Sequence, residues 1–108
     1  MKTVLAQIDS EAGRLDLNFE KIKINILKAK EENADLIIFP EYSLTGYPLG
    51  DILKRHKFLI KEQNSLIDEL SKITDNICAI VGFADENGKS GFAILKNGEI
   101  IKDNILTI

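Results

Sequence analysis

The sequence has no tryptophan, one cysteine, one histidine and only two prolines among its 108 residues. A single cysteine cannot form a disulfide within the chain, and one histidine with one cysteine gives no metal-ligand spacing. No apolar run approaches the ~18 residues that a membrane-spanning helix requires. These absences argue against a disulfide-stabilised scaffold, a metal protein and a membrane protein.

The sequence also lacks an excess of positive charge. Fourteen Lys and Arg face seventeen Asp and Glu, so the formal net charge is -3. Phosphate binding needs a clustered basic surface, and the basic clusters in residues 21–30 and 54–57 are interpreted as solvated helix faces. We therefore expect neither a nucleic acid nor a membrane as partner. The start Met1-Lys2-Thr3 shows no signal-peptide pattern, and together with the lone cysteine this favours a cytoplasmic location.

The remaining composition, 44% hydrophobic and 29% charged, is typical of a globular protein. We find no repeat and no linker, so residues 1–108 are expected to form one domain. The β-branched run 3–8 predicts a strand. A helix is predicted from Asn18, a plausible N-cap with Glu20 near the helix N-terminus, to about residue 33. Its apolar stripe consists of Phe19, Ile22, Ile26 and Ala29.

The next segments continue the alternation of strand and helix. Residues 36–39 are continuously apolar, as in a parallel strand buried on both faces, and complete a βαβ unit. Turn-rich residues 42–50 lead into a helix over about 59–73, with Leu59, Leu66, Leu70 and Ile73 on one face. Residues 77–83 predict another strand. Asn97-Gly98 between the apolar runs 91–95 and 99–101 predicts a hairpin. The fold class is therefore α/β.

Glu41 is the strongest candidate for a chemical role, because it follows the predicted strand 36–39. In open α/β sheets, ligands bind beyond the carboxyl ends of the strands. A partly desolvated carboxylate at that place is suited to act as a general base. The alternatives are a solvated loop glutamate and a partner for a helix cap.

The residues around Glu41 carry a family resemblance. Residues 39–48 (FPEYSLTGYP), preceded by 34–38 (ADLII), resemble the segment around the catalytic glutamate of the nitrilase, or carbon–nitrogen hydrolase, superfamily. The continuation over residues 46–53 looks most like the glutaminase domain of glutamine-dependent NAD synthetase, although Leu49-Gly50 departs from the expected pair of Pro and an acidic residue. Weaker matches are Val4 to Gln7, Asn18, Val81-Gly82 and Asn97-Gly98. The resemblance implies the first half of a nitrilase-type α-β-β-α sandwich.

The resemblance also implies a Glu, Lys, Cys triad that hydrolyses an amide through a thioester. Only Glu41 has a counterpart in this chain, as the base that takes the thiol proton and later activates water. The expected place of the lysine, which would stabilise the oxyanion, is near Leu106, whose side chain cannot do so. Lys102 is the nearest lysine, but it stands about four residues earlier, or ~12 Å along a strand, and is not assigned to this role. Tyr47 is expected either to line the substrate pocket or to pack within its own loop. No cofactor and no metal is implied for this chain.

Two other reactive side chains are interpreted as structural. Cys78 lies within the apolar segment ICAIVGF, where a thiol acts as a small hydrophobic group with a raised pKa. His56 has no cysteine or hydroxyl partner in a catalytic pattern and is expected at the surface.

Two functions remain open at this point. The first is the N-terminal part of an amidase or glutaminase domain whose substrate is a small amide such as glutamine, with this chain inactive by itself. The second is a non-catalytic binding or assembly module, a homo-oligomer or a protein docked on a partner chain, because missing strands would leave a bare sheet edge and apolar faces. A generic flavodoxin-like module is disfavoured, because the second half turns to a hairpin.

Overall fold

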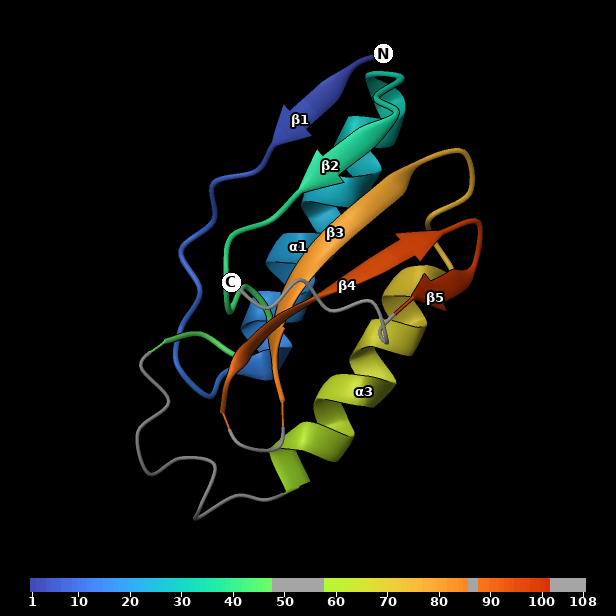
Figure 1. Cartoon of the computed structure of the whole chain (residues 1–108). Helices are drawn as coiled ribbons and strands as arrows, with labels where there is room; N and C mark the ends of the chain where they lie inside the picture. The colour runs from blue at the N-terminus through green and yellow to red at the C-terminus, as the bar shows by residue number, and fades with distance from the viewer. Residues whose placement is uncertain (48–57, 86–87, 102–108) are drawn as a thin grey trace.

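The computed structural model describes residues 1–47, 58–85 and 88–101, and in this part of the chain it shows two helices covering one face of a five-stranded sheet (Figure 1). The predicted residues His56, Lys102 and Leu106, and the pair Leu49-Gly50, lie outside the described residues. In chain order the elements are β1 (Thr3–Leu5), α1 (Leu15–Glu31), β2 (Leu36–Ile38), α3 (Phe58–Ser71), β3 (Cys78–Ala84), β4 (Ser90–Lys96) and β5 (Glu99–Ile101).

The strands lie in the sheet in their chain order, β1-β2-β3-β4-β5. The first three strands are parallel and the last two pairings are antiparallel. Parallel neighbouring strands need a crossover connection. Helix α1 lies between β1 and β2 in the chain, and helix α3 lies between β2 and β3. The predicted α/β fold class is confirmed.

Helix α1 begins earlier than the sequence pattern predicted. Its first residue is Leu15, the cap position is Arg14 without a side-chain hydrogen bond, and the acidic residue of the first turn is Asp16 rather than Glu20. The prediction that Asn18 caps the helix is therefore wrong, because Asn18 lies inside the helix with its side chain buried. The predicted apolar stripe is confirmed, since Ile22, Ile26 and Ala29 are buried and Phe19 is partly buried against the core cluster to which they belong.

Strand β2 is buried fully on only one face. Ile37 points into the core and has no exposed surface, whereas Leu36 and Ile38 are half-buried. The expectation of burial on both faces is wrong for the described residues, because α1 and α3 contact each other on one side of the sheet (Figure 1).

The second half of the chain follows the prediction in outline. The hairpin is confirmed: Lys96 pairs with Glu99 across Asn97-Gly98, which both have the positive φ angles (50° and 82°) of a tight hairpin turn. Helix α3 ends at Ser71, so Ile73 lies beyond it. Leu59 and Leu70 are buried as predicted, but the helix also buries Gln63 and Ile67, while Leu66 is only partly buried.

The sheet face opposite the helices carries a row of apolar side chains. The strand registers place Leu5, Ile38, Ile80, Ile94 and Ile101 beside one another across all five strands. None of these five side chains is buried, and Leu5 is 73% exposed. We call this set the open-face row.

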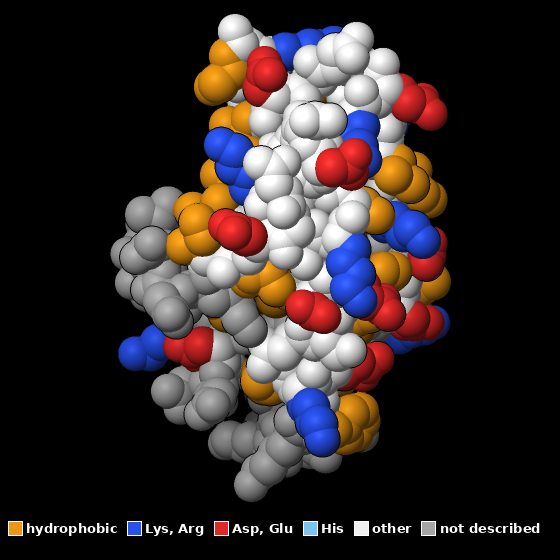
Figure 2. Space-filling model, turned by 90° about the vertical axis from the view of Figure 1, so that its right-hand side faces the viewer, with side chains coloured by type: hydrophobic (Ala, Val, Ile, Leu, Met, Phe, Trp, Pro, Cys, Tyr) orange, Lys and Arg blue, Asp and Glu red, His pale blue; other side chains and the backbone are white. Residues whose placement is uncertain are grey.

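The surface shown in Figure 2 has a mixed charge distribution. Lys and Arg side chains alternate with Asp and Glu side chains, and neither sign forms a large continuous area on this side. Among the described residues, no helix is long and apolar enough to cross a membrane.

Candidate functional site

Glu41 lies on a turn that begins where β2 ends. The last main-chain bonds of this strand run from the Ala6 amide to the Ile38 carbonyl, 2.9 Å, and from the Phe39 amide to the Ile80 carbonyl, 2.9 Å. Pro40 has no amide proton and cannot extend the ladder. The chain therefore leaves the sheet at Pro40, and Glu41 is presented at the carboxyl end of two parallel strands.

Beyond the end of β2, the Ser43 hydroxyl bonds to the main chain of β3 in place of a neighbouring strand. Its oxygen accepts the amide of Gly82 at 2.9 Å and its proton is directed to the Gly82 carbonyl at 3.2 Å. The Leu44 amide donates to the same carbonyl at 3.1 Å. The turn is thus fastened to β3 just beyond the point where β2 ends.

Gly82 has no side chain because the turn lies directly on top of it. A Cβ atom there would stand 2.3 Å from the Pro40 carbonyl oxygen and 2.8 Å from the Tyr42 amide nitrogen. Both are backbone atoms, so they cannot rotate away as a flexible side chain would. Only glycine at this position lets the peptide of Glu41 approach the strand so closely.

A second loop, residues 9–13, fastens the turn from the other side. The Ser10 hydroxyl donates to the Ser43 carbonyl at 2.5 Å, and the Gly13 amide donates to the Thr45 carbonyl at 2.8 Å. Gly46 has a φ of +79°, and a Cβ atom there would meet the backbone of Glu11 at 2.5 Å. The two loops are therefore packed main chain against main chain at the carboxyl ends of β1 and β2.

The structure places the two predicted site residues on this same turn, but in a more open setting than expected. The Glu41 side chain is exposed, so the expected partial desolvation is not present in the described structure. Tyr47 is 70% exposed, and its ring lies against the ring of Tyr42 with centroids 5.1 Å apart. Of the two roles expected for Tyr47, packing within the loop is visible as this ring contact.

Tyr42 is a site residue that the sequence reasoning missed. It has a φ of 54°, a left-handed conformation that costs a non-glycine residue about 1–2 kcal/mol. Its hydroxyl donates to the Gly88 carbonyl at 3.0 Å, which joins the turn to the connection between β3 and β4. Burial raises the pKa of Tyr42 above its ordinary value, and the neighbouring Glu41 carboxylate raises it further.

Ser43 and Gly82 were also missed as functional positions. The signal for Gly82 was in the sequence, because a glycine inside an apolar strand run often marks a close backbone approach. Ser43 gave no such signal, since its partner is 39 residues away along the chain.

Cys78 lies at the opposite end of the sheet from Glu41. It is the first residue of β3, paired in register with Leu36, and four residues before Gly82, or ~13 Å along a strand. The thiol is half-buried, and burial raises its pKa as predicted, with Lys96 acting in the opposite direction. Cys78 is thus not brought to Glu41. Among the described residues, no group of His, Cys, Asp and Glu is arranged to hold a metal ion.

These observations define the class of the protein. It is an α/β protein that presents a glutamate on a clamped turn at the carboxyl end of an inner parallel strand. The chain belongs to the carbon-nitrogen hydrolase family, which matches residues 2–104.

Curated relatives agree with this family. The chain is 34% identical over 104 residues to the glutamine-dependent NAD(+) synthetase of Acinetobacter baylyi, and 30% identical over 105 residues to that of Thermotoga maritima. The alignments cover 93% and 94% of this chain but only 19% and 18% of the relatives. The chain therefore spans about a fifth of the length of these enzymes.

Solved structures show the same fold. The glutamine-dependent NAD+ synthetase of Acinetobacter baumannii superposes with a TM-score of 0.72 at 30% identity, covering 92% of this chain and 19% of that one. An amidase from Nesterenkonia sp. superposes with a TM-score of 0.79 at 18% identity, covering 94% of this chain and 40% of the amidase. That amidase is a member of the nitrilase superfamily, so the predicted nitrilase-type fold is confirmed.

Proposed function

We propose that this chain forms the N-terminal part of a carbon–nitrogen hydrolase domain that, in the complete enzyme, hydrolyses the side-chain amide of glutamine and supplies ammonia for NAD synthesis. The observation that supports this most directly is the placement of Glu41. It lies within residues 39–48, on a turn fastened to β3 at the end of the sheet where ligands bind. The similarity to NAD(+) synthetases extends over 93% of the chain.

In the proposed reaction Glu41 is the general base. It takes the proton of a thiol that attacks the amide carbon and passes this proton to the nitrogen as the carbon–nitrogen bond breaks, so that ammonia leaves and a thioester remains. Glu41 then takes a proton from the water that attacks the thioester and returns it to the thiolate that leaves, which releases the carboxylic acid and regenerates the thiol. The solved amidase has an active-site cysteine. In this chain no residue was matched to that cysteine or to the lysine of the triad, and we expect no turnover from the chain alone.

Tyr47 is proposed to contact the substrate. It is the exposed member of the Tyr42–Tyr47 ring pair and stands on the same turn as Glu41. An exposed aromatic ring beside a base gives a substrate an apolar surface to lie on.

The cytoplasmic location expected from the sequence stays a prediction.

A chimaera tests the proposal. Residues 1–104 of this chain replace the matching segment of the Acinetobacter baylyi enzyme, and ammonia release from glutamine is measured. We expect an active chimaera that loses activity by a factor of about 10²–10⁴ on Glu41→Gln. Glu20→Gln, an exposed carboxylate on α1, is the matched control and should retain activity. Equal activity of the Glu41→Gln and Glu20→Gln chimaeras would show that Glu41 is not the base, and turnover by the unmodified chain alone would contradict its expected inactivity.

The open-face row supports the alternative function, a non-catalytic assembly module. Five unburied apolar side chains in register across the sheet form a continuous surface, and such a surface marks an interaction site. A second copy of the chain or a partner chain would cover it in this alternative.

A further inference from the structure

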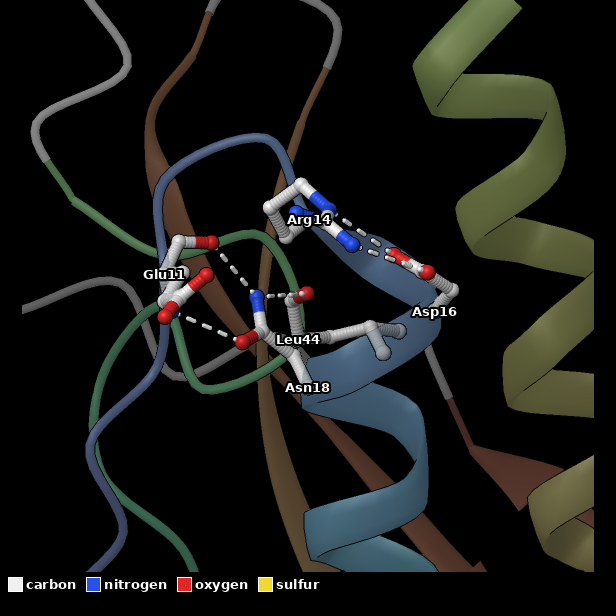
Figure 3. A network of polar contacts seen from close by, with 5 residues as sticks. All are labelled: Glu11, Arg14, Asp16, Asn18 and Leu44. Carbon is white, nitrogen blue, oxygen red and sulfur yellow. Dashed lines mark hydrogen bonds and ion pairs between the residues drawn. The ribbon is translucent and has the colours of Figure 1, made fainter.

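Asn18 is a buried polar side chain whose hydrogen bonds all reach outside its own helix. It has no exposed surface. Its Oδ1 accepts the Glu11 amide at 2.8 Å, while its Nδ2 donates to the Glu11 carbonyl at 2.8 Å and to the Leu44 carbonyl at 2.9 Å. Figure 3 shows the amide group between the loop of residues 9–13 and the turn that contains Leu44. Asn18 is therefore a three-way connection between α1, that loop and that turn.

The chemistry of this position calls for an amide. Two carbonyl oxygens and one N–H group converge on the side chain, so it must offer two donors and one acceptor, as only asparagine or glutamine does. An aspartate has nearly the same shape, but its carboxylate would face the Glu11 and Leu44 carbonyl oxygens without a proton to offer. Buried polar groups left unpaired in this way are costly.

The connection leads directly to Glu41. Leu44 is three residues beyond Glu41, its carbonyl is held by Asn18 and its amide by the Gly82 carbonyl. One peptide segment is thus fixed to α1 on one side and to β3 on the other. Without the Asn18 bonds, the turn would keep its attachment to β3 but lose its attachment to α1.

We infer that Asn18 is a positioning residue: through the Leu44 carbonyl, it fixes the turn that presents Glu41 relative to α1 and to the loop of residues 9–13. This inference rests on the proposed function for the meaning of that position, since Glu41 is the proposed base. The geometric part of the inference is tested without any activity measurement.

The tyrosines provide a reporter confined to this turn. The sequence has no tryptophan and two tyrosines, Tyr42 and Tyr47, and their rings are in contact. Tyrosine near-ultraviolet circular dichroism and tyrosine ionisation followed by absorbance therefore report on the Glu41 turn. Far-ultraviolet circular dichroism, by contrast, reports on the helices and the sheet as a whole.

The experiment compares Asn18→Asp and Asn18→Ser with Asn25→Asp and Asn25→Ser in the full chain. Asn25 is a matched control because it lies on the same helix and, within the described part of the chain, its Nδ2 donates to the Lys21 carbonyl of the preceding turn, at 2.7 Å. We expect both Asn18 variants to keep the far-ultraviolet signal but to lose most of the tyrosine near-ultraviolet signal. The raised pKa of Tyr42 should also move toward the ordinary value of a tyrosine. The Asn25 variants should match the wild type in all three. A folded Asn18→Asp or Asn18→Ser with wild-type tyrosine signals would overturn the inference.

A measurement on the unmodified chain keeps the inference testable when neither Asn18 variant folds. If Asn18 joins the two segments, the Glu11 amide, which donates to Asn18, and the Gly13 amide, which donates to the Thr45 carbonyl of the turn, become exposed in the same opening event. Hydrogen exchange should then give both amides the same opening free energy and the same dependence on denaturant. Two different openings would overturn the inference.

The outcomes separate this inference from the proposed function. If Asn18→Asp moves the tyrosine signals while Glu41→Gln leaves the chimaera fully active, the proposed function fails and the positioning role stands. If Glu41→Gln abolishes activity while Asn18→Asp changes neither the tyrosine signals nor kcat, the positioning role alone fails.

Discussion

At the scale of single residues, the turn that carries the Glu41 carboxylate is held by the uncharged residues Asn18, Ser43 and Gly82. Glu41 could be placed from the sequence because it directly follows an apolar run, and a strand's end is visible in the pattern. Its exposure could not, because exposure depends on which segments pack beside it. Asn18 shows the same limit: an asparagine near a helix start is normally a cap, but α1 begins three residues earlier and the Asn18 side chain bonds to Glu11 and Leu44 instead.

The Tyr42 hydroxyl gives a prediction about pH. Its pKa is raised above 10.0, first by burial and then by the Glu41 carboxylate. The neutral hydroxyl therefore contributes its stabilisation fully below pH 10, and the contribution is lost as the pH rises through the raised pKa. We expect Glu41→Gln to lower the pKa of Tyr42 only part of the way toward 10, because burial, the larger cause, remains. Tyrosinate absorbance titration measures this shift.

Two controls accompany the titration. Tyr42→Phe identifies which of the two ionisations belongs to Tyr42, and Glu20→Gln removes a carboxylate on α1 that is not among the charges acting on Tyr42. An unchanged Tyr42 ionisation in Glu41→Gln would mean that the carboxylate does not lie close to the ring, contrary to the structure.

At the scale of elements, apolar periodicity predicted most of what formed. The spacing of apolar residues predicted the buried stripe of α1 and the strands of the hairpin, and a continuous apolar run predicted β2. Burial of one face of an element selects apolar residues at the period of that element. Helix α3 shows where spacing is insufficient. Gln63 lies on its buried face and its amide pairs with both the amide and the carbonyl of Ala84, at 3.0 and 2.8 Å. A polar residue at a core position is predictable only when its partner is known.

The two faces of α1 yield a stability prediction from identical side chains. Ile26 has no exposed surface, whereas Ile24, two residues earlier, is 60% exposed. We expect Ile26→Ala to lower the free energy of unfolding by about 2–5 kcal/mol, because it removes buried methyl groups and leaves a cavity. Ile24→Ala should change it by less than about 0.5 kcal/mol. Urea unfolding followed by circular dichroism measures both, and similar losses for the two variants would contradict the assigned orientation of the helix.

At the scale of the whole molecule, the described structure is an asymmetric pair of layers. One sheet face is covered by α1 and α3 (Figure 1), while the other carries the open-face row. The sequence pattern of β2 does not reveal this asymmetry, because Leu36, Ile37 and Ile38 are all apolar. In the proposed domain, further layers of the complete enzyme would cover the row; in the alternative, a second copy or a partner chain would.

The open-face row predicts association of the isolated chain. Its apolar side chains should bring copies together as the concentration rises, with an increase in mass measured by light scattering. The double variant Leu5→Lys/Ile101→Lys places charges at both ends of the row and should raise the dissociation constant at least tenfold, or ~1.4 kcal/mol. These side chains are 73% and 40% exposed, so the fold should tolerate the change.

The matched control lies on the outer face of α1. Ile24→Lys/Leu27→Lys alters side chains that are 60% and 39% exposed and should leave the association unchanged. A wild-type chain that stays monomeric at high concentration would count against the assembly module, and equal effects of the two double variants would show that the association does not use this face.

The sequence by itself determined the order of strands and helices, the hairpin, the family resemblance and the place of Glu41 at a strand end. These properties follow from local spacing and from a contiguous segment, residues 39–48. Only the tertiary structure decided that Asn18 is a buried connection rather than a cap, that Gly82 and Ser43 support the turn, and that both described helices lie on the same sheet face. The Asn18 and Ser43 contacts join residues 26 and 39 positions apart, and hydrogen bonding across such separations leaves no periodic pattern in the chain.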